Sequence, residues 1–116
     1  MGLFSFFSNK EIGVFAKDLA ADLAKRYPAA LDVSPDKRVS ANRLSRVLEE
    51  TLSKAVEFQQ KHNLGMFGKA KLGNEFKWQL QELGYTEKFI DLATEALMVY
   101  LTRGVQAPGA GSVEKR

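Results

Sequence analysis

Apolar side chains recur every three or four residues over most of this chain of 116 residues, which is the spacing of amphipathic α-helices. The longest such stripe takes steps of four, three, four, three and four residues through Leu44, Leu48, Thr51, Ala55, Phe58 and His62. Start and stop signals predict helices at about 9–27, 41–63, 68–83 and 87–103. The segment 28–39 is expected to be a loop with one helical turn near Ala29, and 64–67 and 84–86 are expected to be short joints.

No segment shows the period-two alternation of a half-buried strand. The sequence therefore predicts an all-α fold: a compact four-helix bundle-like domain over 1–104. Residues 105–116, with Pro108 and glycines among polar residues, are predicted to form a flexible, disordered tail.

Residues at the predicted helix ends support these limits. Ser40 and Thr86 are good N-caps, and Pro28 and Gly65 are expected to end the first and second helices. Gly73 lies inside the third helix, where glycine costs about 1 kcal/mol relative to alanine. We expect either close packing of another helix at Gly73 or a later start of that helix.

The charge is unevenly distributed. The chain has 17 Lys and Arg against 14 Asp and Glu, a net charge of +3, whereas residues 37–77 alone carry nine Lys and Arg against four Glu, a net charge of +5. This basic segment makes nucleic-acid binding the alternative function, through Arg43, Arg46, Lys69, Lys71 and Lys77. The competing interpretation is that these residues are ordinary solubilising charges.

The chain has no cysteine and one histidine, which excludes disulfides, thiol chemistry and a cysteine-ligated zinc site. We expect no metal or other cofactor. The N-terminus lacks the features of a signal peptide, and no stretch reaches the roughly 20 apolar residues of a membrane span. The sequence thus favours a cytoplasmic location.

Enzyme and nucleotide motifs are incomplete. Residues 68–75 have the glycine spacing of a phosphate loop, but Asn74 and Glu75 stand where Lys and Ser or Thr are needed. The sequence at 65–68 matches a GxxG loop without the mixed α/β context that such a loop requires. In a helix-turn-helix interpretation of 83–103, the reading helix would present Glu87 and Asp91 to phosphate, which repels them. We therefore expect a protein that is not an enzyme.

His62 falls in the last turn of the second predicted helix, on its apolar face. Its expected role is that of a partly buried residue near the helix's terminal carbonyl groups, because no nucleophile or orienting partner can be named for it. A deep pocket that joined His62 with a carboxylate would favour catalysis instead.

The candidate partner-binding surface is the joint after the second helix with the outer side of the third, where large apolar residues interrupt a polar pattern. Its predicted members are Met66, Phe67, Lys71, Trp78 and Tyr85. The alternatives are that Met66 and Phe67 close the end of the bundle and that Trp78 fills a second buried side.

Two further apolar clusters have more than one interpretation. Phe4, Phe6 and Phe7 either pack onto the first helix, form a dimer contact or lie in a membrane interface. The second half of the last helix is apolar almost all round, which places it centrally or in an oligomer interface. The leading hypothesis is a non-enzymatic protein-binding module, with a homodimer as one option.

Overall fold

The computed structural model of the protein describes the backbone of residues 2–33 and 40–103, and the side chains of those ranges from Lys10 onward. These residues are all-α, with α1 (Gly2–Arg26), α2 (Ala29–Val33), α3 (Ala41–His62), α4 (Met66–Leu83) and α5 (Glu87–Arg103). The predicted all-α bundle of four main helices is confirmed, and the turn expected near Ala29 is the short helix α2. The predicted tail at 105–116 and the side chains of Phe4, Phe6 and Phe7 lie outside the described residues.

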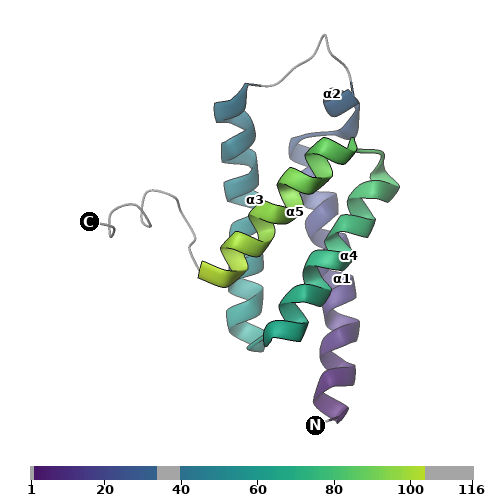
Figure 1. The fold of residues 1–116 in the computed structure, drawn as a ribbon, viewed down its shortest axis with the longest axis vertical. Helices are drawn as coiled ribbons and strands as arrows, with labels where there is room; N and C mark the ends of the chain where they lie inside the picture. Colours follow the sequence, from purple (N-terminus) through teal and green to yellow (C-terminus); the bar gives the residue numbers. More distant parts are fainter. Residues whose placement is uncertain (1, 34–39, 104–116) are drawn as a thin grey trace, which may run out of the picture.

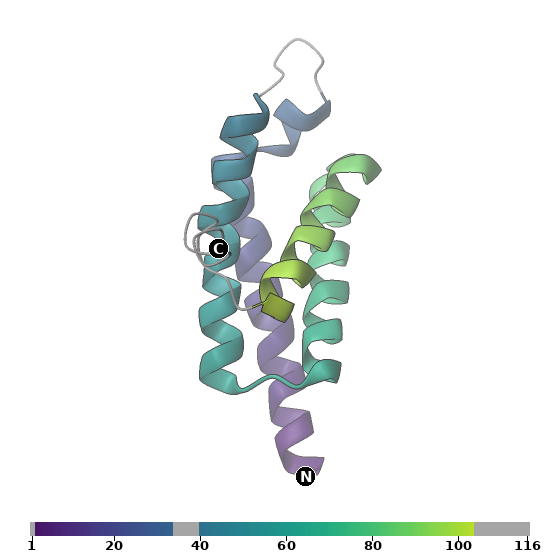
Figure 2. The ribbon, with the colours of Figure 1, turned by 60° about the vertical axis from the view of Figure 1, so that its left-hand side comes forward.

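The four long helices form a bundle in which α3 and α4 occupy opposite corners. α1 packs against α3 and α4, and α5 packs against the same two helices, whereas α3 and α4 have little direct contact. In Figure 1, α3 and α4 stand at the two sides, α1 lies behind them and α5 crosses obliquely in front. The turned view in Figure 2 shows the same order and the first turns of α1 projecting beyond the α3–α4 connection. The outward faces of α3 and α4 therefore point in opposite directions.

Each long helix contributes a stripe of buried apolar residues to one core, as the periodicity predicted. The side chains buried most completely include Ile12, Leu19, Leu23, Leu52, Val56, Leu72, Phe76, Leu80, Leu97 and Leu101. Thr51 is also fully buried, and its hydroxyl has no hydrogen-bond partner. The buried hydroxyl of Thr94 on α5 also has no hydrogen-bond partner.

Four pairs of side chains are in contact across the α1–α3 seam, where these two antiparallel helices meet. The pairs are Glu11 with His62 (3.5 Å), Phe15 stacked on Phe58 (ring centroids 4.1 Å apart), Asp22 with Lys54 (2.9 Å) and Arg26 with Glu50 (2.7 Å). Arg26 also lies 3.3 Å from Asp22 within α1. The register of the two helices therefore pairs charge with charge and ring with ring.

The predicted N-caps are confirmed. The Ser40 hydroxyl accepts the Arg43 amide at 3.1 Å, and the Thr86 hydroxyl accepts the Phe89 amide at 3.2 Å. Gly84 ends α4 at φ 92°, a left-handed conformation that glycine adopts without a steric penalty.

Three details of the predicted helix ends differ in the structure. The helix predicted over 41–63 is observed as Ala41–His62, but the residue that ends it is Asn63 rather than Gly65, because Asn63 itself takes the left-handed conformation (φ 54°) that asparagine tolerates. Gly65 is instead the N-cap of α4, which begins at Met66 rather than near Gly68. α1 begins at Gly2 rather than near Lys10, because no helix-breaking residue separates residues 3–9 from the rest of the helix.

Gly73 marks the place where α4 and α5 approach closely, which confirms the first of the two expectations. A Cβ atom added at Gly73 would lie 2.7 Å from the Met98 sulfur. The absence of a side chain at Gly73 thus makes room for Met98 between the two helices.

At the other end of the bundle, α2 holds Asp32 against the start of α5. The carboxylate of Asp32 accepts hydrogen bonds from the Tyr27 hydroxyl (3.1 Å) and from the Thr86 amide (2.7 Å). A carboxylate is favoured at a helix N-terminus, where backbone amides are unpaired. Asp32 therefore links α2 to both α1 and α5.

Candidate functional site

The outer face of α4 carries four residues in line, which we call the α4 stripe: Phe67, Lys71, Asn74 and Trp78. Their spacing of four, three and four residues keeps them on one side of a helix with 3.6 residues per turn. The stripe lies opposite the buried side chains of Leu72, Phe76 and Leu80. It therefore faces directly away from the core, over a length of about 16 Å.

The apolar members of this face are exposed to an unusual degree. Phe67 is 91% exposed, its neighbour Met66 is 83% exposed and Trp78 is 57% exposed. Phe67 and Trp78 stand about 16 Å apart on this face with Lys71 and Asn74 between them, so they are two exposed rings in line rather than one continuous apolar patch. The structure thus brings together four of the five predicted partner-binding residues: Met66, Phe67, Lys71 and Trp78.

Leu64, rather than Met66 or Phe67, closes the end of the bundle at the α3–α4 joint. It is buried, and its side chain lies 3.2 Å from the position that a Cβ atom of Gly68 would occupy. Gly68 in turn packs near Ile12 of α1. Because Leu64 fills this space, Met66 and Phe67 are left pointing outward.

Tyr85 does not share the exposed surface of Trp78. It is 6% exposed, its hydroxyl donates a hydrogen bond to the Tyr27 carbonyl, and its ring lies 4.9 Å from that of Phe89. The left-handed turn at Gly84 reverses the chain and directs Tyr85 back onto the core. Its predicted place on the partner-binding surface is therefore wrong, and it belongs to the aromatic cluster at that end of the bundle.

Lys71 pairs with Glu75 one turn further along α4, at 3.1 Å, and its side chain is 41% exposed. The pair lies on one flank of the α4 stripe. Ala70 and Lys77, both exposed, lie on the other flank. The stripe thus has an aromatic residue at each end, Lys71 and Asn74 between them, and charged residues on both flanks.

The basic residues of the nucleic-acid alternative are not gathered on one face. Arg43 and Arg46 are exposed near the start of α3, whereas Lys69, Lys71 and Lys77 belong to α4. Because α3 and α4 occupy opposite corners of the bundle, their outward faces cannot form one continuous phosphate-binding surface. The structure separates these five residues into two groups.

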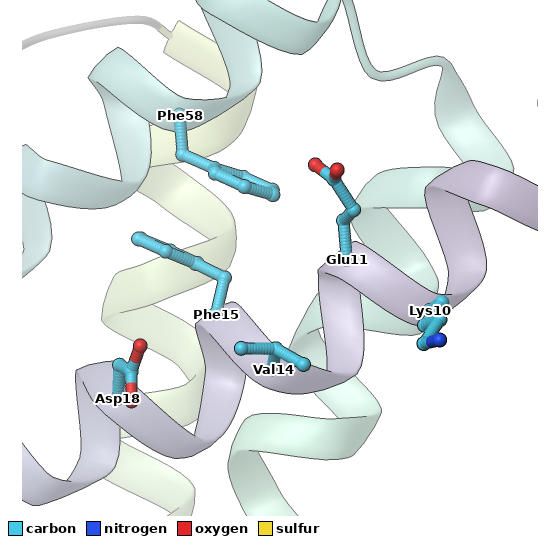
Figure 3. A pocket seen from close by; sticks show the side chains of 6 residues that line it. All are labelled: Lys10, Glu11, Val14, Phe15, Asp18 and Phe58. Atoms are coloured by element: carbon cyan, nitrogen blue, oxygen red, sulfur yellow. The ribbon is translucent and has the colours of Figure 1, made fainter.

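A shallow groove of about 470 Å³ runs along the outer side of the α1–α3 seam (Figure 3). It is lined by Lys10, Glu11, Val14, Phe15, Asp18 and Phe58. The stacked rings of Phe15 and Phe58 lie within it, and Glu11 and Asp18 lie to either side of them in Figure 3. The spacing of residues along the chain does not predict this groove, because only the register of α1 against α3 brings the two rings together.

His62 is half-buried in the last turn of α3, as predicted. Its Nδ1 atom lies 3.5 Å from a carboxylate oxygen of Glu11, and its ring lies 4.5 Å from that of Phe58. The pair borders an open groove rather than the deep pocket that would favour catalysis. Within the described ranges, no group of three or more His, Asp or Glu residues is placed to hold a metal ion.

The outer side of α5 shows a weaker apolar surface. Leu92 and Val99 are 47% and 43% exposed, while Ala93, Leu97 and Leu101 are buried on its inner side. The last helix is therefore one of four bundle helices, and only part of its apolar surface is left outside. None of the helices in 2–33 and 40–103 combines the length and hydrophobicity of a membrane span.

Ionisable groups with shifted pKa values lie in the seam, in the aromatic cluster and, for Tyr100, on α5 near Glu49 of α3, away from the α4 stripe. Burial, with a smaller contribution from Asp32, raises the pKa of Tyr27 and of Tyr85 to about 12. Burial also raises the pKa of Tyr100, and the charge of Glu49 adds to the effect. Burial by itself would raise the pKa of Asp22, but the combined effect of Lys54 and Arg26 is larger and lowers this pKa. These shifts follow from packing and pairing within the fold, and such shifts also occur outside functional sites.

Comparison of the chain with known protein families, curated proteins and solved structures gives no match.

Proposed function

We propose that the protein is a non-enzymatic, cytoplasmic protein-binding module that uses the outer face of α4. The observation that carries this proposal is the exposure of Phe67, at 91%, in line with Trp78 and next to the exposed Met66. Fully burying one such side chain is worth about 1.5–3 kcal/mol. Aromatic residues and methionine are also the side chains enriched at the centres of protein interfaces. The absence of cysteine supports the cytoplasmic location.

The borders of the stripe support a specific surface. Lys71 and Glu75 on one flank and Lys77 on the other would remain hydrated while the apolar residues are covered. Aromatic anchors next to hydrated polar residues are common in protein interfaces. On this basis Phe67 and Trp78 are the anchors, and Lys71 and Asn74 are polar residues between them.

The alternative, nucleic-acid binding through residues 37–77, is less well supported. It would have to use either Arg43 and Arg46 or the lysines of α4, since the two groups lie on helices at opposite corners of the bundle that have little direct contact. Salt distinguishes it from the main proposal, because binding to phosphates weakens steeply between low and moderate salt and an apolar interface does not.

The test is site-specific photo-crosslinking in the native cells. A photoreactive phenylalanine analogue replaces Phe67, Trp78 or, as a control, Val99, which is an exposed apolar residue on α5. We expect discrete crosslinked protein bands from positions 67 and 78 that persist at moderate salt and are absent from position 99. Equal crosslinking from all three positions, or none from 67 and 78, would contradict the proposal. Crosslinks to nucleic acid that disappear at moderate salt would support the alternative.

A further inference from the structure

We infer that the partner of the α4 stripe is a second copy of this chain, bound through an antiparallel pair of α4 helices about a two-fold axis. This inference rests on the proposed function, because it names the occupant of the same face. It is drawn from the order of the stripe's residues and from the charges on its flanks.

The α4 stripe has the same order of residue types in both directions along the helix: aromatic, polar, polar, aromatic. An aromatic residue stands at each end, Phe67 and Trp78, and two polar residues, Lys71 and Asn74, stand between them. An antiparallel copy centred between residues 72 and 73 would place Phe67 opposite Trp78 of the second copy. Lys71 would then lie opposite Asn74 of the second copy. A two-fold interface requires such self-complementarity, because residue i contacts residue j and j contacts i.

The spacing of the stripe suits a helix pair. Steps of four, three and four residues are those of the seam in a two-helix coiled coil. Small or short side chains, Ala70 and Asn74, lie near the middle of this face and allow two helices to approach. In this pair, the Phe67 ring of each copy would pack beside the Trp78 ring of the other copy.

The charges on the flanks match under the same symmetry. In an antiparallel pair related by a two-fold axis, each flank of one helix meets the identical flank of the other. Lys71 and Glu75 lie on one flank, where they already pair at 3.1 Å, so Lys71 of each copy would lie beside Glu75 of the other. On the opposite flank Lys77 would lie beside the uncharged Ala70 of the second copy. Lys71 would lie as near the two-fold axis as Asn74, about 4.5 Å along the helices from Lys71 of the second copy, and the two Glu75 carboxylates beside this pair would offset its positive charge.

The position of α4 in the bundle leaves room for this contact. α4 forms one side of the bundle in Figures 1 and 2, and α1 and α5 pack on its inner side. A single pair of helices buries less surface than a standard stable interface of about 800 Å² per partner. The expected dimer is therefore weak and depends on protein concentration.

The first test measures self-association of the purified full chain. We expect the mass from sedimentation equilibrium to rise toward twice the monomer mass as concentration increases. Fluorescence of Trp78, the only tryptophan, should move to shorter wavelength over the same range, because its ring leaves water. Phe67→Ser and Trp78→Ser should remain monomeric at concentrations where the unchanged chain is dimeric. Val99→Ser, the matched control on α5, should associate like the unchanged chain, and circular dichroism confirms that each variant is folded.

The second test determines the geometry by disulfide crosslinking, which is direct because the chain has no cysteine. Asn74→Cys lies close to the proposed two-fold axis, so its two copies would be near enough to form a disulfide. Gln81→Cys, on the same side of α4, would be about 25 Å from its counterpart in an antiparallel pair but adjacent to it in a parallel pair. Ser45→Cys on α3 is the exposed control. We expect rapid dimer formation for Asn74→Cys alone.

The outcomes separate this inference from the proposed function. A chain that stays monomeric at all concentrations, with Asn74→Cys oxidising no faster than Ser45→Cys, overturns the second copy as partner. If positions 67 and 78 still crosslink to another protein in cells, the protein-binding function is retained with a different occupant. Dimers that form equally with Phe67→Ser, or that crosslink best through Gln81→Cys, also overturn the proposed pairing.

Discussion

The α1–α3 seam and the α4 stripe are built from the same kinds of residues but differ in what those residues contact. In the seam, Phe15 stacks on Phe58 and Asp22 pairs with Lys54, each across two helices. In the stripe, Phe67 and Trp78 face solvent, and Lys71 pairs only within its own helix. The aromatic and charged residues of the seam thus stabilise the fold through contacts between helices. The aromatic and charged residues of the stripe make no such contacts.

This difference gives a general criterion for this bundle. A residue of the seam should contribute to the free energy of unfolding of the isolated chain, whereas a residue of the stripe should contribute only when a partner is present. Four measurements test that division.

The largest expected effect is alkaline destabilisation through Tyr27, which follows α1, and its neighbour Tyr85. Because both pKa values are raised from 10 to about 12, the folded state favours the protonated phenols. Their stabilisation is fully present below about pH 10 and is lost as the pH rises toward 12, on the order of 2–3 kcal/mol for each. Urea unfolding followed by circular dichroism at increasing pH measures the loss. Tyr85→Phe should make the pH dependence shallower, and an unchanged free energy of unfolding above pH 10 would contradict the burial of these phenols.

The second effect compares two aromatic truncations. Phe58→Ala removes a half-buried ring from the stack with Phe15, and we expect it to lower the free energy of unfolding by about 2–3 kcal/mol. Trp78→Ala removes a larger ring that is 57% exposed, and we expect a loss below about 1 kcal/mol. Urea unfolding at concentrations where the chain is monomeric gives both values. Equal losses in the free energy of unfolding would show that Trp78 stabilises the fold, and would remove the distinction between the seam and the stripe.

The third effect compares two ion pairs. Asp22→Asn breaks contacts with Lys54 and Arg26 in the seam, and we expect a loss on the order of 1 kcal/mol at neutral pH. Since pairing lowers the pKa of Asp22, this contribution should be present above the pKa of the unfolded chain, about 3.9, and should disappear as the pH falls below it. Glu75→Gln on α4 should cost less than about 0.5 kcal/mol. If the two substitutions have the same effect at neutral pH, the seam pairs are no more stabilising than a surface pair.

The smallest expected effect is an increase in the stability of the fold. Thr51 lies in the core of α3 with a hydroxyl that has no partner, so Thr51→Val replaces an unsatisfied polar group by a methyl group of similar shape. We expect an increase in thermal stability equivalent to about 0.5–1 kcal/mol. Differential scanning calorimetry measures it, with Thr102→Val on the exposed side of α5 as the control. A loss of stability would show that the Thr51 hydroxyl is hydrogen-bonded in solution.

The sequence predicted the helices and their buried faces, because a period of three to four residues follows directly from helix geometry. It could not predict which helices are neighbours. Nothing in the spacing of Phe15 or Phe58 indicated that their rings stack, or that Arg43 and Lys77 would lie on opposite sides of the bundle. These features depend on the packing order of the helices, which is determined by the whole core.

The candidate site was predicted in part for the same reason. Trp78 and Phe67 could be placed on the outer side of α4 because they lie opposite its apolar stripe. Tyr85 follows Gly84, and its direction depends on the left-handed φ of that residue and on the hydrogen bond to Tyr27. The role of Leu64 in closing the bundle likewise depended on α3 ending at Asn63 rather than at Gly65.

The placement of α3 and α4 at opposite corners has a consequence for the order in which the chain can fold. The two helices are joined by only three residues, yet each packs on α1 and α5 rather than on the other. They therefore do not form a helical hairpin that could assemble early from local contacts. The part of α1 that packs on α4 stays uncovered until α4 has been synthesised, although α3 already covers another part of α1. The α4–α5 pair can form from local contacts, whereas the α1–α4 contact joins distant segments and is slower to form.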